Sequence, residues 1–90
     1  MMTPVEESPP VILLVDDEPR ILSALQRLLR REGYRILTAG SGAAALSILD
    51  QESVNIILSD LRMPGMDGFA FFGAGQDRGL EAARVLMSGN

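Results

Sequence analysis

The stretch IILSDLRMPGMDG, residues 56–68, joins an apolar run to an abrupt polar end. Ile56, Ile57 and Leu58 have the continuous apolar character of a strand that is covered on both faces. The run closes on Asp60, and Pro64-Gly65 then predicts a turn. Burying a charge is costly, so a carboxylate at the last position of such a strand indicates a site at the strand's end.

A second apolar run ends in the same way. VILLV (11–15) leads directly into Asp16 and Asp17, and Glu18-Pro19 follows. Proline is well tolerated in the first turn of a helix. Apolar residues then recur at spacings of three and four until Gly33, a natural helix stop, so we expect an amphipathic helix here. Its apolar face comprises Ile21, Leu22, Leu25, Leu28 and Leu29.

The remaining elements follow from the same patterns. Residues 1–10 read as a flexible tail because they hold three prolines and two adjacent glutamates. Ser41 is a candidate N-cap for a helix. The predicted elements are strands over 34–39, 54–60 and 84–88 and helices over 43–51 and 67–82. This alternation predicts a parallel sheet with helices on both faces.

Composition limits the class of protein. Ninety residues allow one domain, and 47% hydrophobic residues indicate a folded chain. The net charge of −4 argues against nucleic-acid binding by this segment. Without cysteine or histidine, any metal or acid–base chemistry must rest on carboxylates. No run is long enough for a membrane span and the start is unlike a signal peptide, so we expect a cytoplasmic protein.

The acidic strand ends should meet at one place. Open α/β sheets bind ligands at the carboxyl edge where the strand order reverses, between the first and third strands. Asp16, Asp17 and Asp60 should therefore converge there, with Ser88 at the end of the neighbouring fourth strand. An all-oxygen set favours a hard ion, Mg²⁺ before Mn²⁺ or Ca²⁺. A carboxylate facing a metal-bound phosphoryl group is a candidate nucleophile.

Simpler explanations exist for each residue taken alone. Asp16 and Asp17 could be favourable charge at a helix N-terminus, and Asp60 a solvated turn residue. Ser88 could be an ordinary strand end. A common site is favoured over these explanations because all of these residues are expected at the same edge of the sheet.

The segments VILLVDDEP, DLRMPGMDG and RVLMSG together resemble the receiver domain of two-component response regulators, over residues 11–90. The resemblance implies a flavodoxin-like, doubly wound parallel sheet. It also implies a signalling domain, not an enzyme, that switches an output domain or partner. The phosphate donor would be a sensor histidine kinase or a phosphotransfer protein.

The resemblance also assigns roles to single residues. Asp60 would be the phosphoacceptor. Asp16, Asp17, Asp60 and the backbone carbonyl of Arg62 would hold Mg²⁺. Ser88 matches the hydroxyl that turns toward the phosphoryl group. Arg62 and Asn90 match variable positions that influence how fast phosphate is lost.

The resemblance stops after the fourth strand. The family continues with a fourth helix, a lysine-bearing fifth strand and a fifth helix, so we expect strand order 2-1-3-4 in an incomplete receiver domain over 11–90. An exposed fourth strand could pair with another copy in a homodimer. A pseudo-receiver that takes no phosphate is the alternative. A phosphatase of the haloacid dehalogenase type fits poorly, because its nucleophile lies in an Asp-x-Asp pattern on the first strand.

Overall fold

The computed structural model describes residues 9–60, 65, 70–71, 73–74 and 83–87, the last range as backbone only. Four strands and two helices are placed with their bounds, and residues 70–71 and 73–74 are helical. In chain order the elements are β1 (Val11–Val15), α1 (Pro19–Arg30), β2 (Arg35–Ala39), α2 (Gly42–Gln51), β3 (Ile56–Asp60) and β4 (Ala83–Met87).

The four strands form one parallel sheet in the order β2-β1-β3-β4. The predicted strand order is therefore confirmed for the described residues. β1 is central, and all five of its residues are buried, as its unbroken apolar run predicted. The register of β1 with β3 runs from Ile12 opposite Ile56 to Val15 opposite Ser59.

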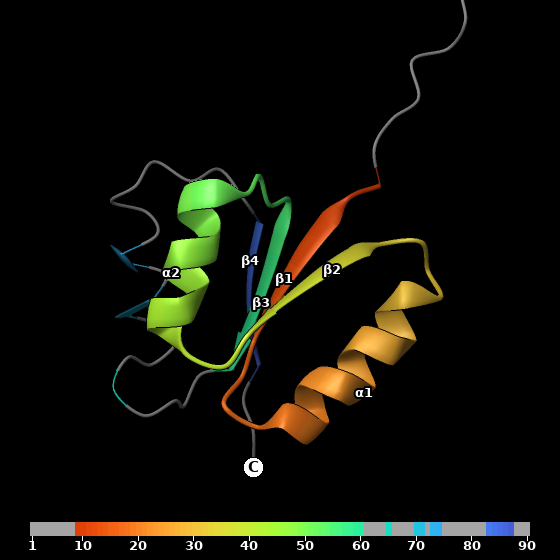
Figure 1. Ribbon diagram of the computed structural model, residues 1–90, viewed down its shortest axis with the longest axis horizontal. Coiled ribbons are helices and arrows are strands. Elements are labelled where there is room, and N and C mark those ends of the chain that lie inside the picture. The colour runs from red at the N-terminus through yellow and green to blue at the C-terminus, as the bar shows by residue number, and fades with distance from the viewer. Residues whose placement is uncertain (1–8, 61–64, 66–69, 72, 75–82, 88–90) are drawn as a thin grey trace, which may run out of the picture.

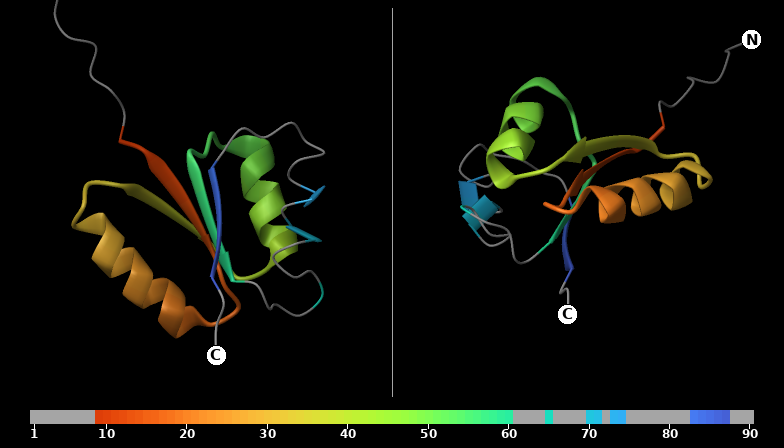
Figure 2. Two further views of the ribbon diagram at one scale, coloured as in Figure 1. Left: turned by 180° about the vertical axis from the view of Figure 1, so that it is seen from behind. Right: turned by 60° about the horizontal axis from the view of Figure 1, so that its bottom comes forward.

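The helices cover the two faces of the sheet. α1 lies on one face and α2 on the other, and the helical residues 70–71 and 73–74 lie beside α2 (Figures 1 and 2). The main core forms on the α2 side, where alternate residues of β1 and β3 meet that helix. Its buried members are Leu13, Val15, Ala39, Ala45, Leu46, Leu49, Ile57 and Phe71. Phe71, which is fully buried, shows that the chain after β3 returns to this core.

α1 is less covered than its sequence suggested. None of its residues is buried. Leu22, Leu25 and Leu29 are half-buried, whereas Ile21 and Leu28 are 40% and 59% exposed. The predicted apolar face is therefore wider than the strip that contacts the described part of the sheet.

Several local signals act as predicted. Pro19 stands in the first turn of α1, and Gly33, after its end, has φ +86°. Gly65 has φ +82°, which suits the turn predicted at Pro64-Gly65, whose proline lies outside the described residues. The Ser41 hydroxyl accepts a hydrogen bond of 3.1 Å from the backbone N–H of Ala44 and so caps α2.

The predicted bounds of β1 are confirmed, whereas β2, β3 and β4 begin one or two residues from their predicted starts. For β3 the difference has a clear physical reason. It begins at Ile56, not at Val54, because Asn55 makes a different pairing with β1. The Asn55 side-chain oxygen accepts from the Val11 N–H at 2.8 Å, while the Asn55 N–H donates to the Val11 carbonyl at 2.9 Å. A side chain thus replaces one backbone group of the ladder. The helix predicted over 67–82 is described only at residues 70–71 and 73–74, where it is helical.

No helix among the described residues combines the length and apolar character needed to cross a bilayer.

Loss of the α2 cap should be measurable. Ser41→Ala removes the acceptor for the Ala44 N–H and should lower the free energy of unfolding by about 1 kcal/mol. Ser47→Ala is the matched control, because Ser47 is exposed within α2 and alanine has the higher helix propensity. Urea unfolding followed by circular dichroism gives both values. An equal effect of the two substitutions would contradict the capping role.

Candidate functional site: three carboxylates at one edge of the sheet

The pairing of β1 with β3 brings two aspartates to one place. Val15 lies opposite Ser59 in the register, so Asp16 and Asp60 follow side by side at the carboxyl edge. Neighbouring strands are about 4.8 Å apart, and residues directly opposite each other point to the same face. Asp17 is one residue further along, where the chain turns toward α1.

The three carboxylates form a compact cluster. Asp16, Asp17 and Asp60 each offer an oxygen, and these oxygens all lie within 4.8 Å of one another. Their exposure is graded, since Asp16 is 2% exposed, Asp60 is half-buried and Asp17 is exposed. The structure thus brings together the three aspartates singled out from the sequence, while their roles as ligands and acceptor stay predictions.

Asp16 is fixed from two directions. Its backbone N–H donates to the Ala39 carbonyl at 3.1 Å, which ties the end of β1 to the end of β2. Its carboxylate accepts from the Glu18 N–H at 2.8 Å. This second bond forms an Asx-type turn that leads into α1. The side chain therefore has a defined direction toward the cluster.

The Glu18 amide was missed in the sequence analysis. Glu18-Pro19 was interpreted only as a helix start, yet its N–H orients a member of the cluster. The signal was present in the sequence, because an aspartate commonly bonds the amide two residues on when the chain turns.

The electrostatic environment of Asp16 is unfavourable to its charge. Burial raises the pKa of Asp16 above its usual value of 3.8, and the hydrogen bond from the Glu18 N–H opposes that rise. Repulsion from Asp60, Asp17 and Glu18 raises the pKa further. At an effective dielectric of about 20, two unit charges about 5 Å apart repel by about 3 kcal/mol. A bound cation would remove this repulsion.

The donor set fits a hard divalent cation. All three side chains offer carboxylate oxygen, the ligand that Mg²⁺ prefers. Mg²⁺ keeps several waters and needs few protein ligands, so a cluster with one buried and one exposed aspartate suits it.

Arg62, Ser88 and Asn90 all lie outside the described residues. The backbone of β4 is described to Met87, which pairs with Asp60 at the end of β3.

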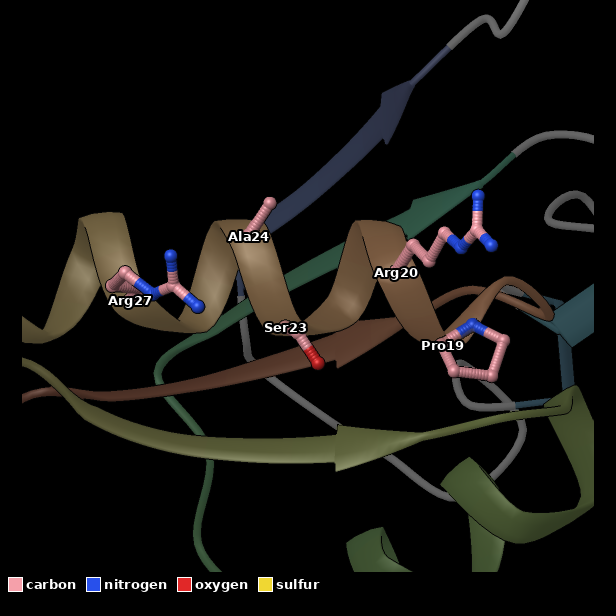
Figure 3. Close-up of a pocket in the computed structure, with 5 residues that line it drawn as sticks. All are labelled: Pro19, Arg20, Ser23, Ala24 and Arg27. Carbon is pink, nitrogen blue, oxygen red and sulfur yellow. The ribbon is translucent and has the colours of Figure 1, made fainter.

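A separate groove runs over the outer surface of α1. It is lined by Pro19, Arg20, Ser23, Ala24 and Arg27, and the guanidinium groups of Arg20 and Arg27 stand on the same side of the helix (Figure 3). None of the three aspartates lines the groove, although its first lining residue, Pro19, follows Glu18 directly in the sequence. It is a basic surface on an acidic chain, whose net charge is −4.

The chain matches the response regulator receiver domain family over residues 12–90. It is 46% identical over 68 residues to the transcriptional regulatory protein GlrR of Escherichia coli (strain K12), which covers 76% of this chain and 15% of GlrR. It is 41% identical over 78 residues to the hydrogenase transcriptional regulatory protein HoxA of Cupriavidus necator, covering 87% of this chain and 16% of HoxA. The chain thus spans only a small part of the length of these relatives.

Solved structures share the fold. The signal receiver domain of an HD domain-containing protein from Pseudomonas fluorescens Pf-5 has a TM-score of 0.86 and 32% identity, covering 91% of this chain and 66% of that one. The response regulator TrrA of Thermotoga maritima, crystallised in complex with Mg²⁺-BeF, has a TM-score of 0.82 and 34% identity. That match covers 88% of this chain and 69% of TrrA.

Neutralising Asp16 should stabilise the metal-free fold. The raised pKa means that the folded state binds the Asp16 proton more tightly than the unfolded state. Wild-type stability therefore falls, relative to Asp16→Asn, as pH rises from 3.8 to the raised value, and the difference persists above it. Asparagine can still accept from the Glu18 N–H. With a chelator present, the melting temperature of Asp16→Asn should exceed that of the wild type at pH 7.

Below pH 3.8 the two proteins should converge, because Asp16 is then protonated in both states. Glu32→Gln, an exposed change beyond the other end of α1, is the control. A variant less stable than the wild type at pH 7 would contradict this account.

Proposed function

This chain belongs to the response regulator receiver domain family, and from that premise we propose that Asp60 accepts a phosphoryl group with Mg²⁺ held by the adjacent aspartates. The observation that carries the proposal is the set of three carboxylate oxygens within 4.8 Å at the carboxyl edge of the sheet. Because Asp16, Asp17 and Asp60 are assembled, nothing here favours a pseudo-receiver.

Asp60 has the position of a nucleophile. A strand held between β1 and β4 presents it, and its half-buried carboxylate remains open to a reactant. One of its oxygens forms a bond to phosphorus while the bond from phosphorus to the donor's histidine nitrogen breaks. The product is an acyl phosphate on Asp60. Mg²⁺, when bound, supplies positive charge against the phosphoryl oxygens.

Asp16 and Asp17 would bind the metal from different environments. Asp16 is buried and oriented by the Glu18 N–H, whereas Asp17 is exposed and can reach a hydrated ion. The similar receiver TrrA was crystallised in complex with Mg²⁺-BeF, which supports magnesium as the ion. By family resemblance, the Arg62 carbonyl completes the protein ligands and the Ser88 hydroxyl turns toward the phosphoryl group.

The partners follow from the family and from the surface of α1. We propose a sensor histidine kinase or a phosphotransfer protein as donor, bound over the Arg20 and Arg27 groove, whose first lining residue, Pro19, is two positions after Asp17. The relatives are several times longer than the matched segment, so the receiver would switch an output domain or partner outside residues 11–90. We propose a cytoplasmic signalling domain and not an enzyme, with homodimerisation through a sheet edge as one output.

Magnesium should stabilise the folded chain. With Mg²⁺ at about 100 times its dissociation constant, binding to the folded state alone adds about 2.7 kcal/mol to the free energy of unfolding. Asp17→Ala should lose most of this response, because it removes one of the clustered carboxylates. Thermal melting with and without MgCl₂ measures the effect, and Glu32→Ala should respond as the wild type. A response of Asp17→Ala equal to that of the wild type would exclude Asp17 as a ligand.

Phosphate should attach to Asp60. Incubation with acetyl phosphate and Mg²⁺ should add one phosphoryl group that is lost on treatment with hydroxylamine, as expected of an acyl phosphate. Asp60→Asn should abolish labelling while the circular dichroism spectrum is unchanged. Asp50→Asn, an exposed change on α2, should still be labelled. Label that persists in Asp60→Asn would place the acceptor elsewhere.

A further inference from the structure

Two polar side chains are buried among the residues that the structure describes, Asp16 and Ser59. Asp16 belongs to the acidic cluster. Ser59 precedes Asp60 in β3 and is completely buried. Because successive strand residues point to opposite faces, the Ser59 side chain lies on the α2 face, with Ile57 and opposite Val15. A hydroxyl among these apolar side chains requires a hydrogen-bond partner.

The partner is the backbone of the neighbouring aspartate. The Ser59 hydroxyl donates to the Asp60 carbonyl oxygen over 3.0 Å. This bond closes a small ring that contains both backbone dihedral angles of Asp60. A restraint on those angles fixes the direction in which the Cα of Asp60 projects its carboxylate. It also fixes the direction in which the chain leaves β3 after Asp60.

We propose that Ser59 is a positioning residue that holds Asp60 in the geometry needed to bind Mg²⁺ and accept phosphate. The inference rests on the proposed function of Asp60 and deepens it. Ser59 contacts neither the cation nor the phosphoryl group, because its side chain is on the other face of the sheet. It acts from inside the core through the backbone of its neighbour.

The rival explanation is packing alone, in which Ser59 is there because a small residue fits. Two pairs of substitutions separate these explanations. Ser59→Ala keeps the small size and removes the hydroxyl. Ser59→Thr and Ser59→Val have the same shape as each other, and only threonine retains the donor. Packing predicts equal behaviour within the second pair, whereas positioning predicts that threonine alone resembles the wild type.

The test is a calorimetric titration of the full chain with MgCl₂. Ser59→Ala should raise the dissociation constant for Mg²⁺ about fivefold, which corresponds to the net loss of one hydrogen bond. Ser59→Val should bind Mg²⁺ about fivefold more weakly than Ser59→Thr for the same reason. Labelling by acetyl phosphate should likewise be slower in Ser59→Ala than in the wild type, and slower in Ser59→Val than in Ser59→Thr. Ser47→Ala, an exposed serine on α2, should bind as the wild type.

Each outcome decides the question. Wild-type affinity in Ser59→Ala, or equal affinities in the threonine and valine variants, would overturn the positioning role. So would a Ser59→Ala chain that fails to fold while the threonine variant folds, because Ser59 would then be a requirement of the fold. If the wild type itself binds no Mg²⁺, the proposed function fails before Ser59 is tested. The two failures are therefore distinguishable.

Discussion

Parallel pairing between β1 and β3 is the constraint on which the site depends. Both strands are apolar, so charge can appear only where each strand reaches the edge of the sheet. The register that places Val15 opposite Ser59 sets Asp16 beside Asp60, residues far apart in the chain. Burial of the strands supplies the rigidity, and their common end supplies the exposure that a reactive carboxylate needs. This is why a strand that begins with an apolar run, residues 56–58, ends in an aspartate.

The same arrangement opposes folding when no cation is bound. Three carboxylates lie within 4.8 Å, and the most buried of them, Asp16, has a raised pKa because of its burial and its acidic neighbours. The fold tolerates this through the Glu18 N–H, which offsets part of the penalty. Binding sites commonly lower the stability of the ligand-free fold in this way, and binding of the ligand then relieves the unfavourable interactions.

Much of this architecture could be predicted from the sequence because the signals are local. Apolar runs identified the strands, Gly33 and Ser41 marked helix ends, and the acidic strand ends indicated the cluster. Contacts that join distant segments were not predictable in this way. The pairing of Asn55 with Val11 depends on the register of two strands that lie far apart in the chain. The bond from Ser59 to the carbonyl of Asp60 is local, but it depends on the burial of the hydroxyl in the core. The exposure of Ile21 and Leu28 on α1 likewise depends on what covers the helix, which periodicity does not specify.

The two hydrogen bonds between Asn55 and Val11 fix the register of β3 against β1 at the end of the sheet opposite the site. Strand side chains alternate with a period of two, so a slip of β3 by one residue relative to β1 would exchange its two faces. Asp60 would then enter the apolar layer beneath α2, and Ser59 would take its place beside Asp16. An asparagine that bonds through both its backbone and its side chain allows one alignment only. The position of Asp60 beside Asp16 at the carboxyl edge thus depends on the side-chain amide of Asn55 at the amino edge, a full strand length away.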